Sequence, residues 1–98
     1  MVLKIIIKPL AELDIDNAIH WYEEQQEKLG ENFLTALKQT LLVVSKNPLS
    51  FRKRYKTVRA VAMQTFPYSL YYILENETIF VIAVIHQKRN PKVWKKRK

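Results

Sequence analysis

The sequence predicts a single α+β domain in which one mainly antiparallel sheet packs against an N-terminal helical hairpin. Three observations predict it. The chain opens with an isoleucine-rich, strand-like run, continues with two segments whose apolar residues recur at helical spacing, and ends with three strand-like runs separated by turn signals. The expected order is therefore β-α-α-β-β-β over residues 1–98, a length that suits one domain.

The first strand and the first helix meet at Pro9. Residues 2–8 are rich in β-branched side chains, which favour a strand. Pro9 ends that strand and can open a helix, because its fixed φ suits the first helical turn. Acidic residues near the start of this helix, Asp14 among them, suit the positive end of the helix dipole. Up to about Lys28, apolar residues form one stripe, which consists of Ala11, Ile15, Ala18, Ile19 and Tyr22.

The second helix is expected from about Glu31 to Lys46, after a short break. Gly30 is predicted to be the left-handed residue that ends the first helix. Asn47 and Pro48 end the second helix, because a residue before proline avoids helical angles. The short break predicts an antiparallel helical hairpin. The apolar stripe of the second helix consists of Phe33, Leu34, Leu37, Leu41 and Val44.

Three strands should follow, at residues 57–64, 68–74 and 79–86. Phe66-Pro67 marks the break between the first two, and residues 75–78 supply a turn before the third. The third run is apolar without interruption, which predicts a strand covered on both faces inside the sheet. We expect the face of the sheet opposite the hairpin to remain at least partly open.

The net charge of +8 is concentrated in two segments without acids. Residues 52–59 hold five basic side chains and residues 88–98 hold seven, together twelve of the 17 in the chain. Seven of the nine acids lie between residues 12 and 31. Such segregation favours a polyanion or an acidic protein as partner. The alternative is a solubilising surface with a frayed basic tail from about residue 87.

Composition excludes several classes of site. The chain has no cysteine, so a disulfide framework and a thiolate metal cluster are excluded. Its single glycine excludes glycine-rich phosphate loops. The longest apolar run, residues 79–85, is too short to cross a bilayer, and the N-terminus does not resemble a signal peptide. We therefore expect a cytoplasmic protein with no cofactor, no metal and no membrane partner.

Four groups of residues, taken in order, resemble one known family. They are Pro9 to Asp14 with Ile19 and Tyr22; Phe33 to Pro48; Arg59, Phe66-Pro67-Tyr68 and Tyr71-Tyr72; and Val84, His86, Arg89, Pro91 and Trp94. Their order and spacing resemble the RelE/ParE superfamily, the toxins (or plasmid stabilisation proteins) of type II toxin-antitoxin systems. The resemblance implies a toxin that arrests growth and a cognate antitoxin protein that neutralises it.

The target divides this superfamily. RelE-like members bind the ribosome and cut mRNA, whereas ParE-like members poison DNA gyrase and are not nucleases. The long hairpin and the Phe-Pro-Tyr segment look more like the ParE-like side, so gyrase inhibition is our first expectation. A RelE-like mRNA interferase is the alternative, and whether the chain is an enzyme stays open. A non-catalytic RNA-binding module is the third reading, because basic residues alternate with aromatic ones.

If the chain is a ribonuclease, His86, Arg59 and Arg89 are the expected catalytic residues. RNA cleavage needs a base, an acid and cations that stabilise the phosphorane. His86 suits proton transfer and the two guanidinium groups suit phosphate. The bland alternatives are a strand-end histidine bonded to backbone and, for Arg59, an ion pair with Glu75 or Glu77.

One residue departs from the RelE-like pattern. RelE-like enzymes often carry a tyrosine or another proton-transferring group near the C-terminus, where this chain has Trp94, and indole cannot shuttle protons. Trp94 could instead stack on a base or cover the core. The residues expected to bind nucleic acid or the antitoxin are Arg52, Lys53, Arg54, Lys56, Arg59, Lys88, Arg89 and Trp94.

Overall fold

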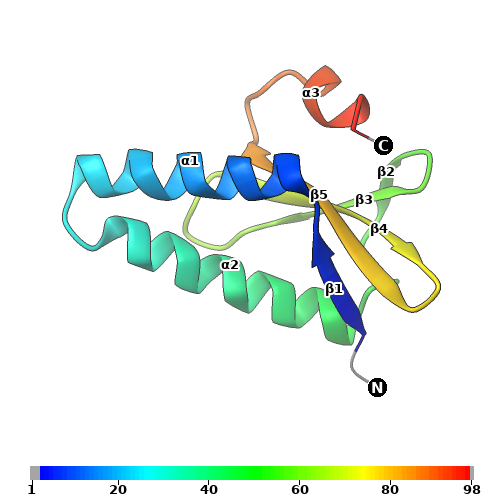
Figure 1. Cartoon of the computed structure of the whole chain (residues 1–98). Coiled ribbons are helices and arrows are strands. Elements are labelled where there is room, and N and C mark those ends of the chain that lie inside the picture. Colours follow the sequence, from blue (N-terminus) through cyan, green and yellow to red (C-terminus); the bar gives the residue numbers. More distant parts are fainter. Residues whose placement is uncertain (1–2, 98) are drawn as a thin grey trace.

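The structure, a computed structural model, describes residues 3–97 and confirms the α+β architecture. The elements are β1 (Lys4–Ile7), α1 (Pro9–Gln25), α2 (Leu29–Lys46), β2 (Lys53–Tyr55), β3 (Val58–Ala62), β4 (Tyr68–Glu75), β5 (Thr78–His86) and α3 (Lys92–Lys95). Figure 1 shows α1 and α2 as a hairpin beside the sheet, with α3 near the end of the chain. The short strand β2 and the short helix α3 were not predicted. β2 lies in the first basic segment and α3 in the second.

Pro9 opens α1 as predicted. Lys8 before it is extended, and proline occupies the first turn, where its missing N–H costs no helical hydrogen bond. Ala11, Ile15 and Ala18 are buried along one face of α1, which confirms the predicted stripe. Among residues 3–97, no helix has both the length and the apolar character needed to cross a membrane.

The prediction for Gly30 was wrong. The left-handed residue between the helices is Lys28, with φ of 71°, and Gly30 lies inside α2. A Cβ atom at position 30 would stand 2.8 Å from the carbonyl oxygen of Ile19 on α1. Glycine is therefore required by the close approach of the helices rather than by its backbone angles. The Glu23 carboxylate accepts hydrogen bonds from the backbone N–H groups of Lys28, at 3.1 Å, and Gly30, at 3.0 Å, around the start of α2.

The sheet has five strands in the order β1-β5-β4-β3-β2. β1 pairs with β5 in parallel, and the other three pairings are antiparallel. β5 therefore lies inside the sheet, as its uninterrupted apolar run predicted. The register between β4 and β5 shifts at Tyr71 and Tyr72, so Ile82 and Ala83 both join the core on the face away from the hairpin.

Each face of the sheet carries its own core. On one face, α1 and α2 pack against β3, β4 and β5, with Phe33, Leu70 and Tyr72 fully buried or nearly so. On the other face, Trp94 of α3 covers Val58 and the middle of β5. The expected open face is therefore partly closed, because the C-terminal segment folds back over it instead of extending as a tail up to residue 97. Lys98 lies outside the described residues.

Candidate functional site

The first basic segment places its side chains on both faces of a short edge strand. β2 pairs with β3 through Lys53 opposite Arg59 and Tyr55 opposite Val58, with an irregularity between Lys53 and Tyr55. Arg52 and Lys53 are exposed and precede or begin the strand. Lys56 follows it in a tight turn with φ of 51°, and its ammonium lies 5.3 Å from the Tyr55 ring centroid.

A polar pocket lies on the α3 side of the sheet, next to β2. Its volume is about 340 Å³, and its lining consists of Arg54, Ala60, Ala62, Ser69, Tyr71 and Gln87. The two alanines come from β3 and leave room above the strand. One guanidinium, a hydroxyl, a phenol and an amide therefore face a common space that suits an anionic oxygen of a phosphate or a carboxylate.

Tyr71 in this pocket is held as a protonated phenol. Burial raises the pKa of its hydroxyl above the ordinary value of 10.0, although the Arg54 charge and hydrogen bonds with Ser69 and Trp94 partly lower it. At neutral pH the hydroxyl is therefore a hydrogen-bond donor and a poor base. Among the described residues, the pocket lining includes no histidine, carboxylate or lysine that could take a proton.

Trp94 packs against Tyr71, which lines this pocket. Its ring stacks on Tyr71 with centroids 4.5 Å apart and an interplanar angle of 18°, and it is only 5% exposed. Tyr55 meets it edge-on at 6.2 Å. In this arrangement the indole covers core, so its faces are not presented to a nucleic-acid base.

Arg59 lies on the opposite, hairpin side of the sheet. Its guanidinium donates to the carbonyl oxygen of Phe51 at 2.7 Å, and the Tyr72 hydroxyl beside it donates to the carbonyl of Pro48 at 2.6 Å. Within residues 3–97 it forms no ion pair with Glu75 or Glu77. Its local role is to tie the segment after α2 to the sheet.

His86 and Arg89 share a second pocket, of about 210 Å³, between α1 and the end of β5. The Nδ1 atom of His86 accepts the backbone N–H of Lys88 at 3.0 Å, so a neutral ring carries its proton on Nε2. Burial raises the pKa of the neighbouring Tyr68, the Arg89 charge opposes that rise, and Asp14 adds to it.

The three residues expected to act together in RNA cleavage are not brought together. Arg59 pairs across the sheet with Tyr72, and Tyr72 pairs with Val81 on β5. Val81 and His86 are five residues apart, roughly 16 Å along a strand. Only His86 and Arg89 share a pocket. Lys88, between them, is exposed.

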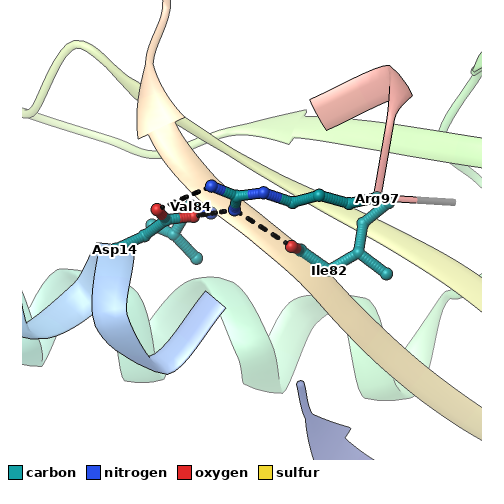
Figure 2. Close-up of polar contacts among 4 residues, drawn as sticks. All are labelled: Asp14, Ile82, Val84 and Arg97. Carbon is teal, nitrogen blue, oxygen red and sulfur yellow. Dashed lines mark hydrogen bonds and ion pairs between the residues drawn. The ribbon is translucent and has the colours of Figure 1, made fainter. Parts of the chain in front are cut away.

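Sequence reasoning missed a buried ion pair that holds the C-terminal segment in place (Figure 2). Asp14 of α1 pairs with Arg97, whose guanidinium also donates to the carbonyl of Ile82 at 3.2 Å. The same carboxylate accepts the N–H of Val84 at 3.1 Å. The ion pair thus bonds to the backbone groups of Ile82 and Val84 on β5, just past Val81, the last residue of β5 that pairs with β1. No pattern in the sequence links positions 83 residues apart.

A comparison with protein-family models shows the family of this chain. A family model described as the ParE toxin of the type II toxin-antitoxin system, parDE, matches residues 5–91. The chain belongs to this ParE toxin family. No curated protein matches it significantly.

Solved structures share the fold of this ParE-family chain. A chain described as the chromosomal ParDE TA system from P. aeruginosa is similar with a TM-score of 0.67 and 16% identity, covering 87% of this chain and 96% of that one. A mutant of E. coli toxin RelE in the free state gives a TM-score of 0.60 and 18% identity, covering 99% and 95%. The isolated E. coli RelE toxin gives 0.57 and 16%, covering 96% and 94%. These likenesses confirm the RelE/ParE-like fold.

Proposed function

We propose that this chain is the toxin of a type II toxin-antitoxin pair that arrests growth by inhibiting DNA gyrase, and that a cognate antitoxin neutralises it. The ParE toxin family match over residues 5–91 carries the proposal. The similar P. aeruginosa chain is described as part of a ParDE toxin-antitoxin system. Gyrase acts in the cytoplasm, so the chain would act there.

The chemistry of the polar pocket argues against RNA cleavage at this pocket. Cleaving RNA at its own 2′-hydroxyl requires a group that takes the hydroxyl proton. The pocket offers Arg54, whose guanidinium has no acceptor atom, and Tyr71, whose pKa is raised by burial. This pair can hold an anion but transfers protons poorly at neutral pH.

Ribosome-dependent mRNA cleavage is the second candidate, and one observation favours it. His86 and Arg89 lie in one pocket, so a proton-transferring imidazole stands beside a phosphate-binding guanidinium. In that case His86→Ala should lower cleavage roughly 10²- to 10⁴-fold, the usual loss for a general acid or base. Binding of RNA without cleavage would use the exposed basic residues, Arg52, Lys53, Arg54, Lys56 and Lys88.

Growth of bacteria after induction tests the proposal. Expression of this chain alone should stop growth, and co-expression of the protein encoded by the adjacent gene should restore it. Arg54→Ala tests the polar pocket, because Arg54 is exposed and its loss should leave the fold intact. Normal growth with the wild-type chain present in soluble form would contradict an active toxin.

A further inference from the structure

The outer edge of β3 is only half covered. β2 pairs with Val58 and Arg59, and among the described residues no strand pairs with the outer side of Ala60–Ala62. The N–H of Met63 donates inward to the carbonyl of Tyr68 on β4 at 2.9 Å. Because backbone groups of successive strand residues point to alternate edges, the N–H and C=O of Ala62 point outward. This edge can accept another strand.

Two pockets flank that edge on opposite faces of the sheet. On the hairpin side, a pocket of about 260 Å³ between α2 and β3 is lined by Val43, Phe51 and Val61 among others. On the α3 side lies the polar pocket that contains Arg54. Ala62 lines both. A strand paired with this edge would send alternate side chains into the two pockets, because side chains alternate between the faces of a sheet.

The two pockets differ in chemistry. All residues lining the hairpin-side pocket are uncharged, and Val43 at its rim is 48% exposed. The other pocket presents one guanidinium with three neutral hydrogen-bonding groups. Between Glu31 and Glu75 the sequence contains no acidic residue, so no carboxylate of that stretch, which includes β2, β3 and most of α2 and β4, competes for Arg54. The matching strand has apolar residues on one face and carboxylates on the other.

We propose that an extended segment of the antitoxin, with apolar and acidic residues in alternation, adds to the outer edge of β3 as a sixth strand. Its main-chain groups pair with Ala62, its apolar side chains enter the pocket beside Val43, and a carboxylate binds Arg54. Main-chain pairing supplies affinity in this mode, and the alternate pockets supply specificity. The inference rests on the proposed function, since it takes the antitoxin as the partner.

The test measures binding of the full-length protein encoded by the adjacent gene, the antitoxin of the proposed function, to the full-length chain and to three variants. Ala62→Pro removes the outward N–H, and an edge strand tolerates proline; we expect affinity to fall about tenfold. Arg54→Glu should weaken binding about tenfold or more, because it opposes the incoming carboxylate. Lys38→Glu makes the same charge change on the exposed face of α2 and should change affinity less than threefold.

Amide hydrogen exchange reads the edge directly in the wild-type complex. Exchange at Ala62 should slow strongly when the antitoxin binds. Unchanged exchange at Ala62, together with wild-type affinity of both Ala62→Pro and Arg54→Glu, would overturn the inference. Formation of a complex would still support the proposed function in that case. Absence of any complex would instead contradict the proposed function. Loss of binding to a single-stranded RNA oligonucleotide in Arg54→Glu, with antitoxin affinity unchanged, would also overturn the inference.

Discussion

The carboxylate of Asp14 joins three segments that are distant in the sequence. It pairs with Arg97 and accepts the N–H of Val84, and both side chains of the ion pair are largely buried, at 9% and 15% exposure. Its position near the start of α1 suggests only a helix-dipole role, because sequence patterns reveal neighbours within an element but not contacts between elements. The actual partners depend on how α1, β5 and the C-terminal segment pack.

Removing that carboxylate should destabilise the fold. Asp14→Asn leaves Arg97 buried without its counter-ion, so we expect the free energy of unfolding to fall by about 3 kcal/mol. Urea denaturation measures it. Asp16→Asn changes an exposed carboxylate on the same helix and should stay within about 0.5 kcal/mol of the wild type. Equal stability of the two variants would show that the ion pair does not hold the C-terminal segment.

Arg59 should act through stability rather than chemistry. Its bond to the Phe51 carbonyl fixes the segment between α2 and β2. Arg59→Ala should therefore lower the free energy of unfolding by about 2 kcal/mol, the usual loss for a hydrogen bond to a charged group. Arg52→Ala, at an exposed arginine nearby, should change it by less than about 0.5 kcal/mol. A stable but non-toxic Arg59→Ala variant would instead support a direct functional role.

At the scale of elements, the helical hairpin was predictable and its closest contact was not. The apolar stripes and Pro9 predicted both helices, since helical periodicity is a local property. Gly30 was assigned to the wrong role, because a glycine near a helix end can serve either a left-handed turn or close packing. Only the approach of α1, with the Ile19 carbonyl against Gly30, distinguishes the two.

Gly30→Ala tests the close contact between α1 and α2. The added methyl group would meet the Ile19 carbonyl and the Glu23 carboxylate, at 2.8 and 3.0 Å from the ideal Cβ position. We expect a loss of about 1–3 kcal/mol, as for other overpacked sites, although alanine favours helix more than glycine does. Thermal denaturation measures it, with Asn32→Ala on the exposed side of α2 as control. A more stable Gly30→Ala chain would mean that the helices can separate at little cost.

Strand β4 makes the fold sensitive to alkaline pH. Burial raises the pKa of Tyr72, although the Arg59 charge partly opposes the rise. In the unfolded chain this phenol ionises near its ordinary pKa of 10.0, whereas in the folded chain it keeps its proton to higher pH. The stability that the protonated Tyr72 phenol contributes is therefore complete below pH 10, and it is lost as the pH rises through the raised pKa of the folded chain.

Comparison with Tyr72→Phe isolates this effect. The variant loses the bond to Pro48 at every pH, so its stability is lower throughout. Between pH 8 and pH 11, however, its urea midpoint should fall less than that of the wild type. Parallel pH profiles would show that Tyr72 ionises equally in both states.

At the scale of the whole molecule, the two basic segments meet at Tyr55, where the ammonium groups of Lys56 and Lys95 lie 5.3 and 5.0 Å from the ring centroid, but other residues of the basic half border different pockets. The β2 segment borders the polar pocket, whereas His86 and Arg89 lie beside α1. Fold class, the order of the longer elements and the interior position of β5 were predictable, because they follow from hydrophobic pattern, whereas the short strand β2 and the short helix α3 were not predicted. The grouping of site residues was not, because it depends on register and on which face each side chain occupies. Ser69 and Gln87, which line the polar pocket, carry no signal in the sequence that marks them as site residues.

We propose that this ParE-family chain inhibits gyrase and does not cut RNA. The most direct measurement is supercoiling of relaxed plasmid by purified gyrase with increasing amounts of the purified chain, with ribosome-bound mRNA mapped in parallel. The proposed function predicts that supercoiling falls while the messages stay intact, and that His86→Ala behaves like the wild type. Full supercoiling, together with cuts in ribosome-bound mRNA that disappear in His86→Ala, would contradict it.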